Sequence, residues 1–311
     1  MPSSVGRTDA GRVRDGNEDA FVADDDLRLY AVADGMGGHR GSEIASQLVI
    51  ETLASFVGDS RRDPAITWPF GFNTLLSFEA NQLQSAVRLA NQQVRYRAQC
   101  EPRYNGIGST LVAVLLAGAR AVFVNVGDSR LYLWRQAALT QVSEDDSWAA
   151  AMLRAGAAPE AASRHEMRHV LTRAVGRPLD LEVTPQYLDL EAADVLLLCS
   201  DGLHGRLGSD AIASVLAAAG EDLARAADAL VEAANAAGGP DNITAVLVRT
   251  SQDGAAASGG RRAGAPGQST VEYVMAAGML VAVGIALSGM LTSGARDFLR
   301  RVVHELSFLS P

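Results

Sequence analysis

The sequence predicts an α+β fold built from antiparallel sheets, followed by one C-terminal transmembrane helix. Three observations support this prediction. The length of 311 residues leaves room for one large domain, or two small ones, with a substantial core. Strand and helix patterns mix irregularly up to about residue 250, without a repeated strand–helix unit. Beyond that point, residues 274–291 carry no charge and are almost entirely apolar.

The composition narrows the possible functions. A net charge of −9 with dispersed acidic residues argues against nucleic acid as a partner, because binding a phosphate backbone requires basic patches. The two cysteines, Cys100 and Cys199, fit neither a disulfide framework nor a metal-binding spacing, and Cys199 lies in an apolar run typical of a core. The N-terminus contains no hydrophobic segment, so we expect the first domain to fold in the cytoplasm.

The first third of the chain predicts one strand and two long helices. Residues 27–34 form a mostly apolar run, which predicts a strand that ends at Asp34. A helix over residues 41–57 and a second one from about Ser77 to Gln99 follow, separated by a loop rich in proline and glycine. The apolar side chains at helical spacing are Ile44, Leu48, Leu53 and Phe56 in the first helix and Leu83, Val87 and Val94 in the second.

The remainder of the first 250 residues predicts mostly strands. Residues 110–142 contain three β-rich runs split by short glycine-containing turns, a pattern that indicates an antiparallel meander. Two further strands are expected at "DVLLLCSDG" and "NITAVLVR". Between them, residues 221–240 predict a helix that ends at a double glycine followed by proline.

Several aspartates stand where these predicted strands end. Each alone is a common turn signal, since Asp-Gly favours chain reversal. Together, carboxylates at strand termini suit hard cations with oxygen ligands, such as Mg²⁺ or Mn²⁺. The aspartates concerned are Asp34 and Asp201, each followed by glycine, Asp241 in "GGPDN" and Asp128 in a turn.

The N-terminal segment "RDGNED" adds a cation to this group of carboxylates. It contributes Arg14 together with Glu18 and Asp19. A guanidinium group beside carboxylate-held metals suits a phosphate ester, because the metals activate water and neutralise charge while the arginine binds phosphoryl oxygens. The sequence therefore predicts phosphate-ester chemistry at a two-metal site.

Eight ordered motifs make the resemblance to a known family specific. They cover roughly residues 5–249 and resemble the motif series of the metal-dependent protein phosphatases, the type 2C serine/threonine family in its bacterial form. The resemblance implies a four-layer α-β-β-α sandwich with the metals in a cleft at one edge of the sheets. The motifs are RDGNED (14–19), VADGMGGHRGSE (32–43), GSTL (108–111), VGDSRLYL (126–133), SEDDSW (143–148), RAVG (173–176), LLCSDGL (197–203) and GGPDNIT (238–244).

The same resemblance implies an activity. Members hydrolyse phosphoserine and phosphothreonine by in-line attack of a hydroxide that bridges two metal ions, without a phosphoenzyme. The implied cofactors are Mn²⁺ or Mg²⁺, two per active site and a third in some members. The implied partners are phosphoserine and phosphothreonine proteins, including Hanks-type kinases and their substrates.

The family's ligand roles are carried over one position at a time. By resemblance, Asp34 bridges both metals and the carbonyl oxygen of Gly35 binds the second metal. Asp201 and Asp241 would bind the first metal. Glu18 would hold the second metal, directly or through water.

Further positions complete the implied site. Arg14 would bind the phosphate of the substrate, and Asp128 resembles the ligand of a third metal, with Asp201 shared. The adjacent Asp145 and Asp146 are candidates for the same third site, and the sequence does not choose between them. Residues 146–173 correspond to the family's variable flap, a contributor to substrate choice.

One position departs from the family pattern. Many eukaryotic members carry a histidine where this chain has Met36, and that histidine is the usual candidate for protonating the leaving alkoxide. Methionine cannot donate a proton, so a metal-bound water or another group, with His39 nearby in sequence, would have to serve. No role is assigned to the remaining candidates, His165, His169 and His204.

Two alternative hypotheses, each assigning the chain to a functional class other than enzymes, remain open. The chain could be a catalytically inactive phosphatase fold used as a membrane-tethered binding module, or the C-terminus could be the functional part with the first domain as its regulator. The intact aspartates and Arg14 argue against an inactive fold. Metal-dependent turnover of a phosphothreonine peptide would separate the enzyme from both alternatives.

The C-terminal part predicts a membrane anchor. Residues 1–250 would form the phosphatase domain, 251–270 a linker by composition, 271–293 a transmembrane or pilin-like helix, and 294–311 an amphipathic tail. The 18-residue uncharged run would measure about 27 Å as a helix, enough to cross a bilayer core. We therefore expect a cytoplasmic catalytic domain held at the membrane by one helix.

The segment "GQSTVEY" before this helix resembles the processing site of Flp-type pilins. In that family a prepilin peptidase cuts after the glycine, here Gly267, and a glutamate at the fifth mature position, here Glu272, aids assembly. The alternative is a plain C-terminal anchor with Glu272 at headgroup depth, where a single glutamate is tolerated.

Overall fold

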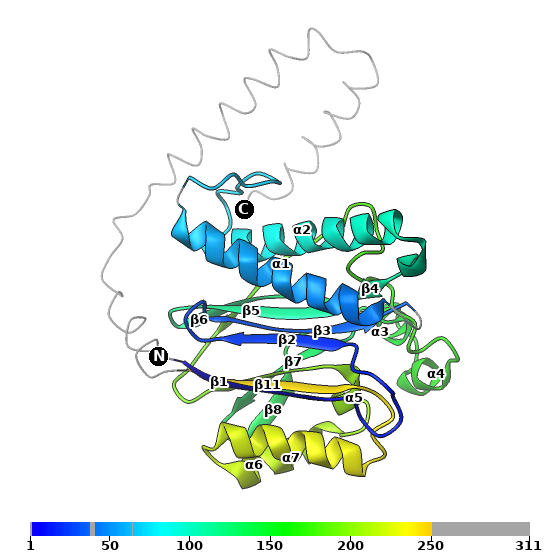
Figure 1. Cartoon of the computed structure of the whole chain (residues 1–311). Coiled ribbons are helices and arrows are strands. Elements are labelled where there is room, and N and C mark those ends of the chain that lie inside the picture. The colour runs from blue at the N-terminus through cyan, green and yellow to red at the C-terminus, as the bar shows by residue number, and fades with distance from the viewer. Residues whose placement is uncertain (1, 38–40, 64, 251–311) are drawn as a thin grey trace, which may run out of the picture. The chain divides into compact units, whose positions relative to one another are not determined.

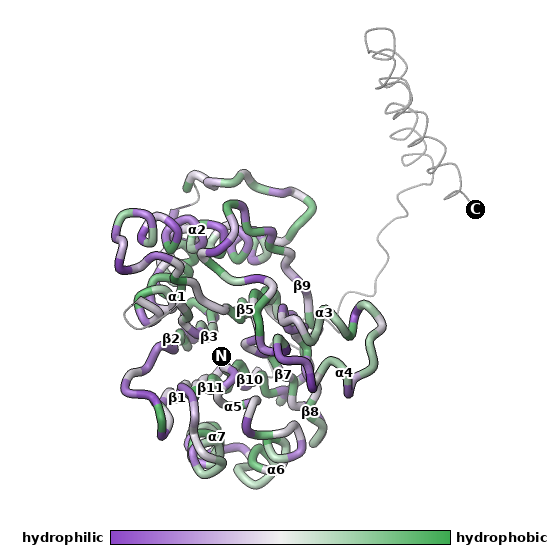
Figure 2. Tube along the Cα trace, turned by 90° about the vertical axis from the view of Figure 1, so that its right-hand side faces the viewer, coloured by the Kyte–Doolittle hydropathy of each residue, from purple (hydrophilic) through white to green (hydrophobic). Residues whose placement is uncertain are grey.

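The computed structural model describes residues 2–37, 41–63 and 65–250. Two antiparallel sheets pack face to face, and helices cover the outer face of each, giving four layers (Figures 1 and 2). This arrangement confirms the α+β class with antiparallel sheets. The predicted linker, transmembrane helix, amphipathic tail and processing site lie outside the described residues. None of the helices in the described ranges is both long and apolar enough to span a bilayer.

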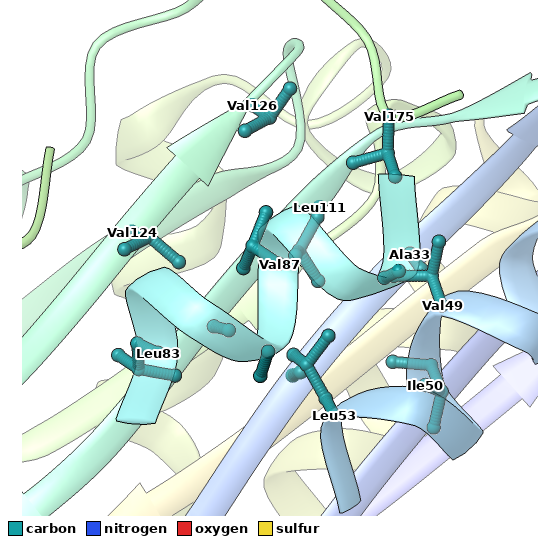
Figure 3. Close-up of a cluster of buried hydrophobic side chains, with 14 of the residues drawn as sticks. Ala33, Val49, Ile50, Leu53, Leu83, Val87, Leu111, Val124, Val126 and Val175 are labelled. Atoms are coloured by element: carbon teal, nitrogen blue, oxygen red, sulfur yellow. The ribbon is translucent and has the colours of Figure 1, made fainter. Parts of the chain in front are cut away.

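The first sheet has the strand order β2-β3-β5-β6-β9, with β4 paired to β3. Two long helices, α1 and α2, pack on its outer face, and their apolar faces form a cluster with the strands (Figure 3). The bounds are β2 Asp19–Asp24, β3 Leu29–Met36, β4 Gly108–Ser109, β5 Leu111–Ala117, β6 Arg120–Val126, β9 Gln186–Asp189, α1 Ser42–Arg62 and α2 Phe78–Cys100.

The second sheet has the strand order β1-β11-β10-β7-β8. Helices α6 and α7 cover its outer face and form a second apolar cluster with its strands (Figure 1). A third apolar cluster fills the space between the two sheets. The bounds are β1 Ser3–Asp9, β7 Arg130–Arg135, β8 Ala138–Gln141, β10 Val195–Cys199, β11 Ile243–Arg249, α6 Ser209–Ala219 and α7 Leu223–Ala236. The short elements are η1 Pro102–Tyr104, α3 Trp148–Arg154, α4 Pro159–Arg164 and α5 Asp201–His204.

The long predicted helices form for local reasons. The side chain of Ser77 caps α2 by accepting a hydrogen bond from the backbone N–H of Ala80, and Leu83, Val87 and Val94 are buried as their spacing predicts. Cys199 is fully buried in β10, which confirms its prediction as a core residue. These elements could be predicted because propensity, capping and burial agree.

The predicted meander over residues 110–142 is wrong as a single sheet. Strands β5 and β6 belong to the first sheet, whereas β7 and β8 belong to the second. The chain crosses between the sheets at Gly127, whose φ of 99° favours glycine and where a Cβ atom would lie 2.8 Å from the side chain of Thr110. This crossing brings Asp128 to the edge where both sheets end.

Candidate active site

A cleft of about 800 Å³ opens at this edge of the sandwich. It is lined by side chains from both sheets and from the loops that join them. Seven of the residues that the sequence singles out for metal or phosphate binding line this cleft: Arg14, Glu18, Asp34, Gly35, Asp128, Asp201 and Asp241. Met36, His169, Arg173 and Arg177 also contribute to its walls.

Strand β3 positions Asp34, which lies two residues before the end of the strand. Its backbone N–H donates to the hydroxyl of Thr110 at 3.0 Å, and its carbonyl oxygen accepts from the N–H of Thr110 at 2.8 Å. The Thr110 hydroxyl in turn lies 2.6 Å from that of Ser129. Paired backbone and side-chain bonds therefore fix the backbone at Asp34 where its carboxylate reaches the cleft.

The glycine after Asp34 allows a close approach of three segments. A Cβ atom at Gly35 would lie 2.0 Å from the carbonyl oxygen of Ser42, the first residue of α1. The N–H of Gly35 donates to the carbonyl oxygen of Glu18 at 3.1 Å, and the same oxygen accepts from the Ser46 hydroxyl. The loop that carries Glu18 is thus held against β3 and α1.

On the second sheet, Asn242 joins the segments that carry the other candidates. Its side-chain amide donates to the carbonyl oxygens of Ala10 and Gly16, and its side-chain oxygen accepts from the N–H of Glu18. Its own carbonyl oxygen would lie 2.0 Å from a Cβ atom at Gly202, so only glycine fits there. Asn242 is part of the motif "GGPDNIT", but the sequence alone indicated no role for it.

The carboxylates of the cleft are electrostatically unfavourable to one another. Burial, together with the neighbouring Asp19, Asp201 and Asp128, raises the pKa of Asp34 well above its usual range. Burial and the charges of Asp201 and Asp145 raise the pKa of Asp128 to about 7. Burial and the charge of Asp241 likewise raise the pKa of Asp201. A cation among these groups would lower the free energy of their charged forms.

Asp19 belongs to the same cluster. The sequence placed it among the N-terminal carboxylates but did not indicate it as a metal ligand. It pairs with Asp34 across β2 and β3 and is 8% exposed. One carboxylate oxygen accepts from the hydroxyls of Ser200 and Thr244, at 2.7 and 2.6 Å, and the other is buried without a hydrogen-bond partner in the described chain. Burial raises its pKa to about 7 despite these bonds. Its position directly after Glu18 in "RDGNED" was the available signal.

Arg14 and Asp241 form an ion pair at the mouth of the cleft. Arg14 Nη2 lies 2.8 Å from Asp241 Oδ2, and Asp241 Oδ1 accepts from the N–H of Asn242. Both oxygens of Asp241 are therefore engaged. As placed in the described part of the chain, no group of three or more histidine, cysteine, aspartate or glutamate side chains could hold a metal ion. The carboxylates nevertheless line one cleft together with the backbone of Gly35.

The neighbouring Asp145 and Asp146 do not line the cleft. Asp145 accepts three hydrogen bonds from the guanidinium group of Arg130, at 2.7 to 3.2 Å. Asp146 accepts from the N–H of Gly127 at 3.2 Å and pairs with Arg173 at 3.4 Å. Both carboxylates have hydrogen-bonding partners within the described part of the chain.

The histidines differ in their relation to the cleft. His169 lines it, whereas His165 stacks at a tilt on Trp148. His204 is half-buried, with Nε2 2.9 Å from the carbonyl oxygen of Asp128, and desolvation lowers its pKa to about 4. His39 lies outside the described residues.

The residues of the cleft fit divalent cations by their chemistry. The candidate ligands are carboxylates and a backbone carbonyl, the hard oxygen donors that Mg²⁺ and Mn²⁺ prefer. One oxygen of Asp201 is buried without a hydrogen-bond partner among the described residues. The pKa values of Asp34, Asp128 and Asp201 are raised, mainly by burial and then by neighbouring carboxylates, as expected for a cluster of acidic ligands.

Comparisons with known proteins show which family the chain resembles. Residues 10–247 match the family model described as protein phosphatase 2C. The serine/threonine protein phosphatase PstP of Mycobacterium tuberculosis is 39% identical over 242 residues, which are 78% of this chain and 43% of that protein. The serine/threonine phosphatase stp of Listeria monocytogenes is 35% identical over 247 residues, 78% of this chain and 93% of that protein. The chain thus aligns with less than half the length of the mycobacterial relative.

Solved structures share the fold. The crystal structure of the M. tuberculosis phosphatase PstP superposes with a TM-score of 0.70 at 37% identity, covering 80% of this chain and 99% of that one. A structure of the PstP catalytic domain in complex with two manganese ions gives a TM-score of 0.68 at 36% identity, covering 80% and 98%.

Proposed function

The chain belongs to the protein phosphatase 2C family, and we propose that it hydrolyses phosphoserine and phosphothreonine in proteins with two divalent cations, Mn²⁺ or Mg²⁺. One observation carries this proposal. Seven residues expected to bind metal or phosphate come from distant parts of the chain, and all of them line one cleft. The relatives named as serine/threonine phosphatases and the manganese-bound neighbour support the same activity.

The proposed metal ligands divide between the two sheets. Asp34, the Gly35 carbonyl and Glu18 lie on the first sheet and its preceding loop, and Asp201 and Asp241 lie at the ends of β10 and β11 in the second. Bound there, two divalent ions would supply an activated water and neutralise charge on the phosphate. Asp128 would extend the site toward a third ion.

The chain's own residues would orient the substrate. Arg14 is half exposed and held at the mouth of the cleft by Asp241, so its guanidinium group lies where a phosphate would enter. A planar guanidinium group binds two phosphoryl oxygens at once, which fixes the phosphate in one orientation. We propose that Arg14 would give up its ion pair with Asp241 and bind the phosphate instead. Asp241 would then serve as a metal ligand.

The test is hydrolysis of a phosphothreonine peptide with and without Mn²⁺. Phosphate release that requires Mn²⁺, is lost in EDTA and returns when Mn²⁺ is restored would support the enzyme. Calorimetric titration of Mn²⁺ into the wild type and Asp241→Asn adds a readout independent of turnover. Equal Mn²⁺ binding by both proteins would remove Asp241 from the site. Metal binding without any turnover would favour the inactive binding module.

We also propose a cellular setting, supported by the sequence alone. The uncharged run at 274–291 would anchor the catalytic domain to the cytoplasmic membrane, where Hanks-type kinases and their substrates would be its partners. The segment at Gly267 and Glu272 would be a pilin-type processing site whose cleavage releases the phosphatase.

An N-terminally tagged chain distinguishes anchoring from processing. Blots of membrane and soluble fractions would compare cells with and without a prepilin peptidase, and the wild type with Gly267→Ala. A shorter soluble band that requires both the peptidase and Gly267 supports processing. A single full-length membrane band in every lane overturns processing and supports the anchor, and a full-length soluble band overturns both.

A further inference from the structure

Two smaller pockets adjoin the central cleft, since each shares lining residues with it. One, of about 510 Å³, shares Arg177 with the cleft and is also lined by Arg95. The other, of about 480 Å³, shares Asp201, Asp241 and His169 with the cleft, and Arg168 and Arg206 contribute to its walls. The three pockets share lining residues, with arginines in the two smaller pockets and carboxylates in the central cleft. Below, these three pockets together are called the flanked groove.

We propose that the flanked groove binds an extended phosphopeptide that carries acidic or phosphorylated residues on both sides of the phosphoresidue in the central cleft. The inference rests on the proposed phosphatase activity and adds a substrate class to it. Its support is the placement of four arginines around a site whose own charge is negative.

The first end of the groove is built by Arg177 and Arg95. Arg95 Nη1 donates to the backbone carbonyl oxygen of Arg177 at 3.0 Å, which holds the two residues together. Neither guanidinium group has a carboxylate partner among the described residues, although ion pairs engage many other arginines of this acidic chain. The exposed side chain of Asn105 adds a further donor to the pocket. Two neighbouring cations without a counter-ion favour an anionic ligand.

The distance of this end from the reacting position follows from the strand register. A Cβ atom at Gly108 would lie 3.4 Å from Cγ of Arg177, and Gly108 pairs with Met36. Met36 is two residues beyond Asp34, or about 7 Å along a strand. An extended peptide advances about 3.3–3.6 Å per residue. The guanidinium group of Arg177 would therefore meet a side chain two or three residues from the phosphoresidue.

The second end lies beside Asp201 and Asp241, two of the candidate metal ligands. The N–H of Gly205 donates to the carbonyl oxygen of Asp201 at 2.7 Å, so Arg206 follows one short helical turn after that aspartate. Its side chain is exposed and makes no ion pair within the described chain. Arg168, also exposed, faces the same pocket from the flap segment. Both ends thus present exposed guanidinium groups within a few residues of the reacting position.

Four fluorescent phosphothreonine peptides test the proposal. One has neutral flanks, one has acidic residues only on the N-terminal side, one only on the C-terminal side, and one on both sides. The wild type and the variants Arg177→Ala and Arg206→Ala are compared by kcat/KM with Mn²⁺ and by peptide affinity from fluorescence anisotropy. Arg225→Ala is the matched control, because Arg225 is exposed on α7 and lines none of the three pockets.

The expected result is a preference for acidic flanks that each variant loses on one side only. Exposed charge pairs predict about a twofold to fivefold change in kcat/KM for each flank, decreasing with added salt. Arg177→Ala should remove the preference for one flank and Arg206→Ala the preference for the other, while Arg225→Ala keeps both. Because each variant is judged by a ratio between two peptides, a general loss of activity does not imitate this result.

Two results would overturn the flanked groove. The wild type could treat all four peptides alike, or each variant could weaken all peptides by the same factor, which would indicate a structural role. Flank-dependent affinities without hydrolysis of any peptide would support the groove and overturn the proposed phosphatase activity.

Discussion

The aspartates of the cleft and two aspartates beside the second sheet are all at least partly buried but have opposite surroundings. Asp145 accepts hydrogen bonds from the guanidinium group of Arg130, and Asp194 accepts them from that of Arg135. Each pair is joined by at least two hydrogen bonds. Asp34, Asp128 and Asp201 face one another instead, and their pKa values are raised. A buried carboxylate with a guanidinium partner is compensated within the fold, whereas buried carboxylates that face each other favour protonation or a bound cation.

Asp241 stands between the two groups. It belongs to the cleft, yet it carries an arginine partner in Arg14. Both side chains of this pair are substantially exposed, at 50% for Arg14 and 34% for Asp241, so the pair contributes little to stability. Such a pair can be exchanged for a metal ion and a phosphate at small cost. The contrast between framework and cleft carboxylates yields five predictions.

The largest effect is expected for Asp34→Asn. Removing one charged ligand from a site that works by charge neutralisation should lower Mn²⁺-dependent kcat by at least about a hundredfold. The free energy of unfolding should not fall in metal-free buffer, because the substitution removes repulsion between buried carboxylates. Kinetics and urea titration in EDTA measure the two quantities. Normal turnover by this variant would contradict the assignment of Asp34.

Arg14→Ala comes next. The loss of a charge-assisted contact to phosphate, of roughly 1.5–3 kcal/mol, should reduce kcat/KM about tenfold to a hundredfold. Mn²⁺ affinity should stay the same or rise, since Asp241 loses its competing partner. Steady-state kinetics and calorimetry check both parts. An unchanged kcat/KM would remove Arg14 from the active site.

Asp145→Asn tests the framework group. The substitution leaves Arg130 largely buried with a neutral partner, so we expect a loss of about 2–3 kcal/mol in the free energy of unfolding. The catalytic rate of the folded protein should remain close to that of the wild type. Denaturant unfolding and kinetics measure the two effects. A large loss of turnover at unchanged stability would move Asp145 into the catalytic group.

His204→Gln tests whether the environment of His204 makes the free energy of unfolding depend on pH. Burial, and then the charge of Arg130, lowers the pKa of His204 from 6.5 to about 4. A depressed histidine pKa means that the folded state resists protonation, so stability is lost as the pH falls below about 6.5. Between pH 7 and pH 5 the wild type should lose about 1–2 kcal/mol more than the variant. Parallel stability curves for the two proteins would contradict this environment for His204.

The smallest effect is expected for Asp189→Asn. Asp189 pairs with Arg120 at 2.9 Å, but its side chain is 84% exposed. The free energy of unfolding should change by less than about 0.5 kcal/mol. This variant is a charge-matched control for Asp145→Asn. A loss as large as that of Asp145→Asn would show that burial does not separate the two kinds of ion pair.

The sequence by itself determined the long helices, the buried strands and the set of candidate residues in the cleft. These features depend on local signals: apolar spacing in α1 and α2, the cap at Ser77, and aspartate beside glycine where strands end. The order of the motifs added the family. Each signal could be read without knowing what lies across the fold, because it acts within a few residues.

Only the tertiary structure decided which of the acidic residues belong together. The crossing at Gly127 placed β7 on the other sheet, so that Asp128 lines the cleft while the nearby Asp145 pairs with Arg130. The pairing of β2 with β3 brought Asp19 beside Asp34, and Asn242 tied the loop of Glu18 to β11. A carboxylate's role depends on whether an arginine or another carboxylate faces it, and that partner is a hundred or more residues away in several of these cases.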